Sequence, residues 1–346
     1  MVNNRKVIFI GPIGGGKVPT NGASVKNYYI VQKLKDCFSC LTVVDTERWK
    51  RNPLILLKLL FVILINKNAK YILSLNNMSA YRVLKFMSAL DGNREIYYWI
   101  IGGSIAQWLK EGKVSKDPYR CVYKFLAEGK SMVEVLEGLG FNNAIYVPNF
   151  KKISYMPVRN NENGIVRFIF LSRINPHKGC DYILSVTEKL NQRYSSLFEV
   201  DFYGEVAPDY FTFTERIKGL ANVNYNGFID LRDYKNYDKI STYDAMLFPT
   251  YWHGEGFPGV LIDAFIAGLP VIASDWHLNG DIISNGENGF LIKTGDEDAL
   301  YDVMERCIQN PSIIRKMSPS CQKLAMNYDC DKVLTSKFFE SIGLIC

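Results

Sequence analysis

Two carboxylates stand eight positions apart in one stretch, residues 245–276, with the sequence AMLFPTYWHGEGFPGVLIDAFIAGLPVIASDW. Glu255 comes just before a short predicted helix, from about Pro258 to Ala267, and Asp263 lies on that helix. A helix start presents unpaired N–H groups and the positive end of the helix dipole, so a loop-to-helix junction after a parallel strand binds anions readily. The stretch therefore predicts a site for a diphosphate.

Two cations stand at a similar junction earlier in the chain. Arg173 and Lys178 flank the loop that follows the predicted strand Val166–Leu171, just before Gly179 and a helix. Arginine offers a planar fork of donors and lysine a point charge, and together they can neutralise a diphosphate. The alternative is a pair of solvated surface charges, but the matching site at Glu255 favours a function.

A glycine-rich loop follows the first predicted strand, Lys6–Gly11. Residues 11–18, GPIGGGKV, nearly match a phosphate-binding P-loop, but Val18 stands where that motif needs a hydroxyl for Mg²⁺. We therefore expect a flexible backbone that approaches a ligand closely, or a turn that serves packing only. A second strand-to-glycine-to-helix junction occurs at residues 101–104. The candidate residues of these two loops are Gly14, Gly15, Gly16, Gly102, Gly103 and Ser104.

Strands and helices alternate along the whole chain, which predicts two consecutive doubly wound α/β domains with ligands at the carboxyl ends of the strands. We expect a first domain over 1–150, a polar linker over 151–164 and a second domain over 165–330. A single helix over Asp331–Leu344 is expected to end the chain, with residues 331–346 packing back on the first domain. The predicted strands are Lys6–Gly11, Cys40–Val44, Tyr71–Leu75, Glu95–Ile100, Ala144–Val147, Val166–Leu171, Phe198–Tyr203, Val223–Tyr225, Ala245–Pro249 and Phe290–Ile292.

The basic charge lies in the first half of the chain. Residues 1–150 carry 21 Lys and Arg against 10 Asp and Glu, whereas residues 151–346 carry 20 against 25. An anionic partner for the first half follows, either a membrane surface or nucleic acid. The apolar run Leu54–Ile65 is too short to span a bilayer, for which about 20 residues are needed. With Trp49 and the surrounding bases, this run resembles an interfacial helix, although a core helix is the equal alternative. The bases are Arg48, Lys50, Arg51, Lys58, Lys67 and Lys70.

The N-terminus runs directly into a strand with no cleavage site, so we expect no signal peptide and a cytoplasmic protein. The eight cysteines of the chain are expected to be reduced thiols in ordinary packing. The three histidines lack metal-type spacing, and the acidic clusters at 296–298 and 329–331 are interpreted as helix caps. No metal site and no cofactor are predicted.

Together these residues resemble a known family. The stretch EGFPGVLIDAFIAGLPVIASD is similar to the signature of the retaining glycosyltransferases of glycosyltransferase family 4, which have the GT-B fold of two Rossmann-like domains. Supporting matches are SRINPHKG near residue 172, Gly204-Glu205, the Asn-Gly-Phe at 226–228, Val-Pro-Asn at 147–149 and GENGF from 286. The resemblance covers essentially all of the second domain, but only the architecture and the glycine loop of the first.

The resemblance implies a role for each matching position. Glu255 would contact hydroxyls of a donor sugar, Asp263 would hold the ribose of the nucleotide, and Arg173 and Lys178 would stabilise the leaving diphosphate in place of a metal ion. The backbone N–H groups of the helix start would meet the phosphates. The remaining donor-binding residues are Gly256, Phe257, Gly259, Val260, Gly204, Glu205, Gly227 and Phe228.

Two departures from the family pattern stand out. Asp263 is one methylene shorter than the glutamate normally found there. The family often has a histidine in the first domain facing the donor sugar, but here all histidines lie beyond residue 176 and the matching junction is Ile101–Ser104. The backbone N–H groups of that junction could replace the histidine.

The leading hypothesis is a membrane-peripheral hexosyltransferase on the inner face of the membrane. It would move a sugar from a nucleotide-sugar to a hydroxyl of a lipid-linked glycan with retention of configuration. The alternatives are a nucleotide-sugar epimerase and a catalytically lapsed binding protein of a polysaccharide assembly. Nucleic-acid binding is disfavoured, because the basic residues surround an apolar run instead of interleaved stacking aromatics.

Overall fold

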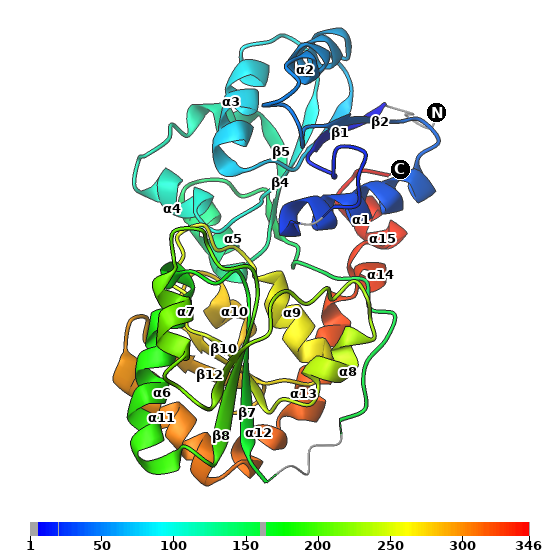
Figure 1. Ribbon diagram of the computed structural model, residues 1–346. Coiled ribbons are helices and arrows are strands. Elements are labelled where there is room, and N and C mark those ends of the chain that lie inside the picture. The colour runs from blue at the N-terminus through cyan, green and yellow to red at the C-terminus, as the bar shows by residue number, and fades with distance from the viewer. Residues whose placement is uncertain (1–5, 20, 160–163, 346) are drawn as a thin grey trace. The chain divides into compact units, whose positions relative to one another are not determined.

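The computed structural model describes residues 6–19, 21–159 and 164–345. The chain divides into two compact units, and each is described by itself. Unit 1 comprises Met1–Lys151 and Cys330–Cys346, and unit 2 comprises Lys152–Asp329 (Figure 1). Residues 160–163 of the predicted linker lie outside the described part of the chain.

Unit 1 is built on a six-stranded parallel sheet in the order β2-β1-β3-β4-β5-β6. β1 is a short apolar run, and β3 is apolar after its first residue, Lys70; both are buried throughout, as strands covered on both faces must be. The strands are β1 (Val7–Gly11), β2 (Leu41–Asp45), β3 (Lys70–Leu73), β4 (Glu95–Trp99), β5 (Val122–Ala127) and β6 (Ala144–Tyr146). The helices are α1 (Gly22–Cys37), α2 (Leu54–Ile65), α3 (Asn77–Ser88), α4 (Ile105–Lys110), α5 (Lys130–Gly138), α14 (Cys330–Val333) and α15 (Ser336–Ser341).

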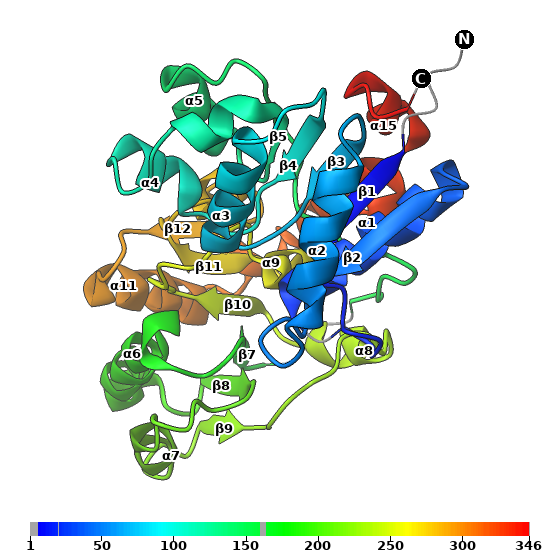
Figure 2. The same ribbon diagram turned by 90° about the horizontal axis from the view of Figure 1, so that it is seen from above.

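Helices cover both faces of this sheet (Figure 2). α1 and α15 pack on one face with Phe9 and Trp99, while α2 and α3 lie over the other. The single helix predicted over 331–344 is wrong, because Thr335 interrupts it. Thr335 adopts an extended backbone and its side chain accepts a hydrogen bond from Phe338 N at 3.1 Å, so that it ends α14 and caps α15.

α2 buries only one narrow stripe, formed by Leu59, Val62 and Ile63. Apart from the exposed Lys58 and the half-buried Ile55, the rest of its surface is apolar and exposed, at Leu54, Leu56, Leu57, Leu60, Phe61, Leu64 and Ile65. Among the described residues, none of the helices is both long and apolar enough to cross a membrane. One predicted member of the basic set is wrong: Lys70 is buried, and its ammonium donates to the carbonyls of Gly343 at 2.7 Å and Leu344 at 3.1 Å.

Unit 2 repeats the architecture with the strand order β12-β11-β10-β7-β8-β9, all parallel. α6 and α11 cover one face of the sheet, and α9 and α13 pack together on the other (Figure 1). The strands are β7 (Val166–Leu171), β8 (Phe198–Tyr203), β9 (Val223–Tyr225), β10 (Ala245–Phe248), β11 (Val271–Ser274) and β12 (Gly289–Ile292). The helices are α6 (Cys180–Tyr194), α7 (Thr212–Ile217), α8 (Asn236–Ile240), α9 (Gly259–Ile266), α10 (Asn279–Ile282), α11 (Glu297–Gln309), α12 (Ser312–Arg315) and α13 (Ser318–Ala325).

A buried ion pair lies at the carboxyl end of β5 in unit 1. The ammonium of Lys26, on α1, lies 2.5 Å from the carboxylate of Glu128, and both side chains are at least 95% buried. The same ammonium lies over the rings of Trp99 and Phe150, at 5.5 and 5.8 Å from their centroids. Burial lowers the pKa of Lys26 despite the opposing effect of Glu128. Each charge therefore depends on the other to remain inside.

Removing one member of this pair should destabilise the protein strongly. We expect Lys26→Met to lower the free energy of unfolding by about 3–5 kcal/mol, because Glu128 would stay buried without its cation. The double variant K26M/E128L should recover most of that loss. Urea unfolding followed by circular dichroism measures both. The control is Lys33→Met, which breaks the more exposed pair with Asp331 and should cost less than about 1 kcal/mol; equal losses for the two single variants would contradict the prediction.

Candidate active site

The candidate residues of unit 2 lie in loops that leave the carboxyl edge of its sheet. The loop after β7 carries Arg173 and Lys178, and the neighbouring strand β10 is followed by the loop with Glu255. On one side of these strands the loops after β8 and β9 contribute Gly204 and Gly227. Since the carboxyl ends of parallel strands meet at one edge, the sheet topology places these residues in one row.

Lys178 and Glu255 form an ion pair at the centre of this row. The Lys178 ammonium contacts Oε2 of Glu255, and the two side chains are only 13% and 11% exposed. Thr250, which is wholly buried, donates its hydroxyl to the same Oε2 at 3.2 Å. The Lys178 backbone is fixed in turn by Asn175, whose side-chain oxygen accepts from Lys178 N at 3.2 Å. Two residues 77 positions apart are thus joined within hydrogen-bond range.

A glycine makes this meeting possible. Gly179 has a φ of +78°, and a Cβ at this position would lie 2.2 Å from the carbonyl oxygen of Pro249, which follows β10. Any other residue would be strained and would push the two loops apart. Behind the contact, Tyr251 N donates to the carbonyl of His177 at 2.8 Å. The β7 and β10 loops are therefore held against each other by backbone contacts.

Arg173 is the second predicted cation, and it differs from Lys178. Its side chain is exposed and has no hydrogen bond or ion pair to any residue in the described ranges. The backbone around it is nevertheless fixed, because Ser172 N donates to Tyr203 O at 3.1 Å and Ile174 N to Glu205 O at 2.9 Å. A fixed backbone with an uncommitted guanidinium is suited to capturing an anion.

The start of α9 presents unpaired backbone donors. Pro258 caps the helix, so the N–H groups of Gly259 and Val260 precede the first internal hydrogen bonds. These two groups and the N–H of Gly256 have no acceptor among the described residues. The side chain of Phe257 is buried and packs edge-on against Tyr328, at 5.2 Å between ring centroids. The junction is therefore anchored by one ring while its donors stay open.

Asp263 is buried on α9, only 5% exposed. Its Oδ1 accepts a hydrogen bond from the hydroxyl of Tyr237, on α8, at 2.7 Å. The shorter acid thus shares its carboxylate with a phenol from the crossover helix between β9 and β10. Sequence reasoning missed Tyr237, because nothing in the spacing of the two residues signals the contact.

The loops after β8 and β9 are joined at the end of the row. Gly204 N donates to Gly227 O at 2.8 Å, and the hydroxyl of Tyr225 donates to Gly204 O at 3.1 Å. A Cβ on Gly204 would lie 1.8 Å from the carbonyl of Ser172, so the position admits only glycine. Phe228 follows as a 66% exposed ring, and Glu205 is exposed beside Gly204.

His277 lies in the loop after β11, on the other side of β10. It is the sole non-glycine residue with a positive φ, 49°, in the described ranges, and its Nε2 is buried without a hydrogen-bond partner. Burial lowers the pKa of His277, the charge of His253 lowers it further, and Glu255 opposes both effects. Backbone strain and an unpaired buried nitrogen are features of functional sites that the sequence does not display.

The glycine loop of unit 1 is occupied by its own chain. Asp45, at the end of β2, accepts hydrogen bonds from Ile13 N at 3.1 Å and Gly15 N at 2.7 Å. Gly14, Gly15 and Gly16 all have positive φ, so the loop has the shape of an anion-binding turn, but a carboxylate fills it. This geometry agrees with the rejection of a P-loop.

The second candidate loop of unit 1 follows β4. Gly102 has a φ of +87°, and Gly103 and Ser104 lead directly into α4. Ser104 is the N-cap residue of α4, but its side chain makes no capping hydrogen bond. The N–H groups at this junction belong to the same carboxyl edge of the unit 1 sheet as the loop of Gly14, Gly15 and Gly16.

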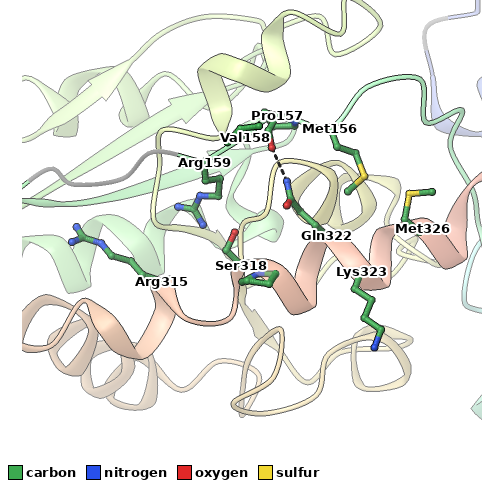
Figure 3. Close-up of a pocket in the computed structure, with 10 residues that line it drawn as sticks. Met156, Pro157, Val158, Arg159, Arg315, Ser318, Gln322, Lys323 and Met326 are labelled. Atoms are coloured by element: carbon green, nitrogen blue, oxygen red, sulfur yellow. Dashed lines mark hydrogen bonds between the residues drawn. The ribbon is translucent and has the colours of Figure 1, made fainter.

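A cavity of about 690 Å³ lies elsewhere in unit 2 (Figure 3). Its lining includes Arg159, which donates to the carbonyl of Gly268 at 2.6 Å, and Arg315, which pairs with Asp244 at 2.8 Å. Gln322 bonds the carbonyl of Pro157 across it at 2.8 Å. Gly268 and Asp244 precede β11 and β10, so the cavity lies at the amino ends of the strands, away from the row of candidate residues.

Part of the chain is similar in sequence to known glycosyltransferases. Residues 166–310 match the family model "Glycosyl transferases group 1". A 41.2 kDa protein from the cps region of Klebsiella pneumoniae is 27% identical over 167 residues, 47% of this chain and 43% of that protein. The capsular polysaccharide biosynthesis glycosyltransferase CapM of Staphylococcus aureus is 34% identical over 93 residues, 26% of this chain and 24% of CapM.

Likeness of fold extends over the whole chain. The crystal structure of Anabaena HepE in complex with UDP superposes with a TM-score of 0.71 at 15% identity, covering 98% of this chain and 99% of HepE. In sequence, however, the chain spans less than half the length of the curated relatives it matches. The two parallel six-stranded sheets are those of the GT-B fold, as predicted.

Gly204 provides a test of the row of loops. We expect Gly204→Ala to destabilise the protein by about 1–3 kcal/mol, since the new methyl group would overlap the carbonyl of Ser172. Thermal unfolding measures the loss. Gly219→Ala is the matched control, because a Cβ there meets nothing closer than 3.8 Å. A destabilisation no larger than that of the control would show that the β7 and β8 loops are not packed as described.

Proposed function

We propose that the chain is a group 1 glycosyltransferase of family 4 that transfers a hexose from a nucleotide-sugar to a glycan hydroxyl with retention of configuration. The match of residues 166–310 to the family model, the similar polysaccharide glycosyltransferases and the GT-B fold support this proposal. The observation that carries the proposal is the Lys178–Glu255 pair beside the open donors of α9. This pair places a cation that can bind a diphosphate next to a carboxylate that can accept hydrogen bonds from sugar hydroxyls.

Charge stabilisation supports this chemistry. When the bond between the sugar and the diphosphate breaks, negative charge grows on the leaving oxygens, and fixed cations and N–H groups at that point lower the barrier. Lys178 keeps donors to spare beyond its contact with Glu255, and Arg173 is uncommitted. We propose that these two cations, with the N–H groups of Gly256, Gly259 and Val260, hold the diphosphate in the role that a metal ion has elsewhere.

The rest of the donor would extend along the row of loops. Glu255, fixed by Lys178 and Thr250, accepts hydrogen bonds from hydroxyls of the transferred sugar. Asp263 binds the ribose from its place beside Tyr237. The base lies toward the β8 and β9 loops, formed by Gly204, Glu205, Gly227 and Phe228, where the exposed ring offers a stacking surface. UDP in the complex of the similar HepE structure supports UDP as the first nucleotide to test.

Substitutions at the ion pair should separate binding from turnover. We expect Lys178→Met to weaken UDP binding about 10- to 100-fold, because a buried cation for the diphosphate is lost. Glu255→Gln should change UDP binding less than about threefold and lower kcat about 100-fold or more. Calorimetry with UDP and turnover of a panel of UDP-sugars, with and without EDTA, provide the measurements.

One control variant and three alternative outcomes complete this experiment. Lys189→Met removes an exposed cation of α6 and should leave both quantities unchanged. Donor conversion without any acceptor, giving an epimerised nucleotide-sugar, would instead favour the epimerase. Nucleotide binding without turnover of any donor would favour the lapsed binding protein. Loss of activity with EDTA would contradict the metal-independent mechanism.

We further propose that unit 1 binds the acceptor, a lipid-linked glycan, at an anionic membrane surface on its cytoplasmic side. The support is α2, which exposes large apolar side chains around most of its circumference. Exposed bases flank it at Arg48, Lys50, Arg51 and Lys67, and Lys58 is an exposed base within the helix. An apolar helix ringed by bases is the composition of interfacial membrane anchors. The glycine loops at 14–16 and 102–104 would then receive the acceptor at the carboxyl edge of the same unit.

Membrane binding is tested with the apolar face of α2. Leu57 and Phe61, 62% and 61% exposed, lie one turn apart, and the double variant L57E/F61E should lower retention on vesicles of phosphatidylglycerol at least about 10-fold. Charge reversal at Lys50 and Arg51 should lower the retention of the protein on these vesicles and should also make the retention less sensitive to salt. The control is Leu197→Glu, an exposed leucine of unit 2. Equal retention of all variants, or none by the unmodified protein, would contradict the proposal.

A further inference from the structure

Trp252 is an exposed indole three residues before Glu255. Its side chain is 44% exposed, whereas Phe248 and Phe257, in the same stretch, are buried. The indole N–H of Trp252 has no hydrogen-bond acceptor among the residues that the structure describes. The residue therefore contributes little to the core, although it stands next to the carboxylate of the candidate site.

The backbone that carries this indole is fixed. Trp252 N donates to the hydroxyl of Thr250 at 3.3 Å, and Trp252 O accepts from Glu255 N at 3.0 Å and from the indole N–H of Trp276 at 2.9 Å. Thr250 also bonds the carboxylate of Glu255. One small hydrogen-bonded turn thus presents the indole and the carboxylate together. Because this turn is already ordered without a ligand, a ligand that stacks on the ring loses less conformational entropy of the protein on binding.

The position of the ring is set by two neighbours. His177 lies 5.6 Å from it, centroid to centroid, and Gly254 lies directly beneath its edge. A Cβ on Gly254 would lie 2.5 Å from the indole nitrogen. Gly254 has no left-handed φ, so an alanine there is compatible with the backbone and would act only by displacing the ring.

We propose that Trp252 is a sugar-binding platform, on which the C–H face of a hexopyranose stacks while its hydroxyls reach Glu255. The face of an indole carries negative charge density and attracts the weakly positive C–H groups of a sugar ring, as it attracts cations. A carboxylate accepts hydrogen bonds from neighbouring hydroxyls on the rim of the same ring. The platform rests on the proposed function, and the sugar it holds is either the one transferred from the donor or the terminal sugar of the acceptor.

The experiment compares UDP with the UDP-sugar that the unmodified protein turns over. We expect Trp252→Ala to leave the Kd for UDP within about twofold and to raise either the Kd for the UDP-sugar or the KM for the acceptor about 10-fold. Gly254→Ala should act in the same direction, and it should add nothing in the W252A background, where no ring remains to be displaced. Trp252→Phe, which keeps an aromatic ring, should raise the same Kd or KM less than Trp252→Ala does. Tyr123→Ala, which removes a ring of 45% exposure from the amino end of β5, is the control.

Each result has a distinct meaning. A higher Kd for the UDP-sugar assigns the platform to the donor sugar, and a higher acceptor KM alone assigns it to the acceptor; both support the proposal. Unchanged values for both, or an equal loss for UDP and UDP-sugar, would overturn it. Additive effects of G254A and W252A would also overturn it, because the glycine would then act independently of the ring. Failure of the unmodified protein to bind UDP would overturn the proposed function instead, and that result is seen before any variant is compared.

Discussion

The close approach of two loops in unit 2 is the constraint on which the site depends. Gly179, in the left-handed region, lets the β7 loop touch the carbonyl of Pro249 after β10. With the loops at that separation, the Lys178 ammonium contacts Glu255. Two charges that would be costly to bury singly become stable together, and Thr250 satisfies a further lone pair of the carboxylate. The ion pair at the centre of the site therefore depends on the lack of a side chain at Gly179.

The same reasoning explains what can be predicted from the sequence. Glu255, Arg173 and Lys178 lie at strand-to-helix junctions, and such junctions are visible as an apolar run followed by glycine and a periodic segment. Their convergence at one edge then follows from parallel topology alone. Most strands are predictable for the same reason, since short buried runs bounded by turns need no tertiary information. The GT-B architecture therefore follows from local patterns along the chain.

What could not be predicted depends on contacts between distant residues. The β5 strand was missed because Tyr123 and Lys124 break its apolar run, and α3 because its buried residues form only a narrow stripe. Tyr237 reaches Asp263 across two helices, and the strain at His277 is a backbone property. The break at Thr335 was overlooked because a capping threonine looks like any other polar residue inside a helical pattern. Local patterns specify helices and strands, whereas tertiary packing decides which distant side chains contact one another.

The two units differ in whether the N–H groups of their candidate anion-binding loops already have acceptors. In unit 1 the glycine loop donates its N–H groups to Asp45, so that the chain neutralises its own anion site. In unit 2 the N–H groups at the start of α9 have no acceptor among the described residues. An anion would have to displace a carboxylate in the first case but not in the second. With comparable topology in both sheets, the helix start of unit 2 is therefore better suited than the glycine loop of unit 1 to binding a diphosphate, as proposed above.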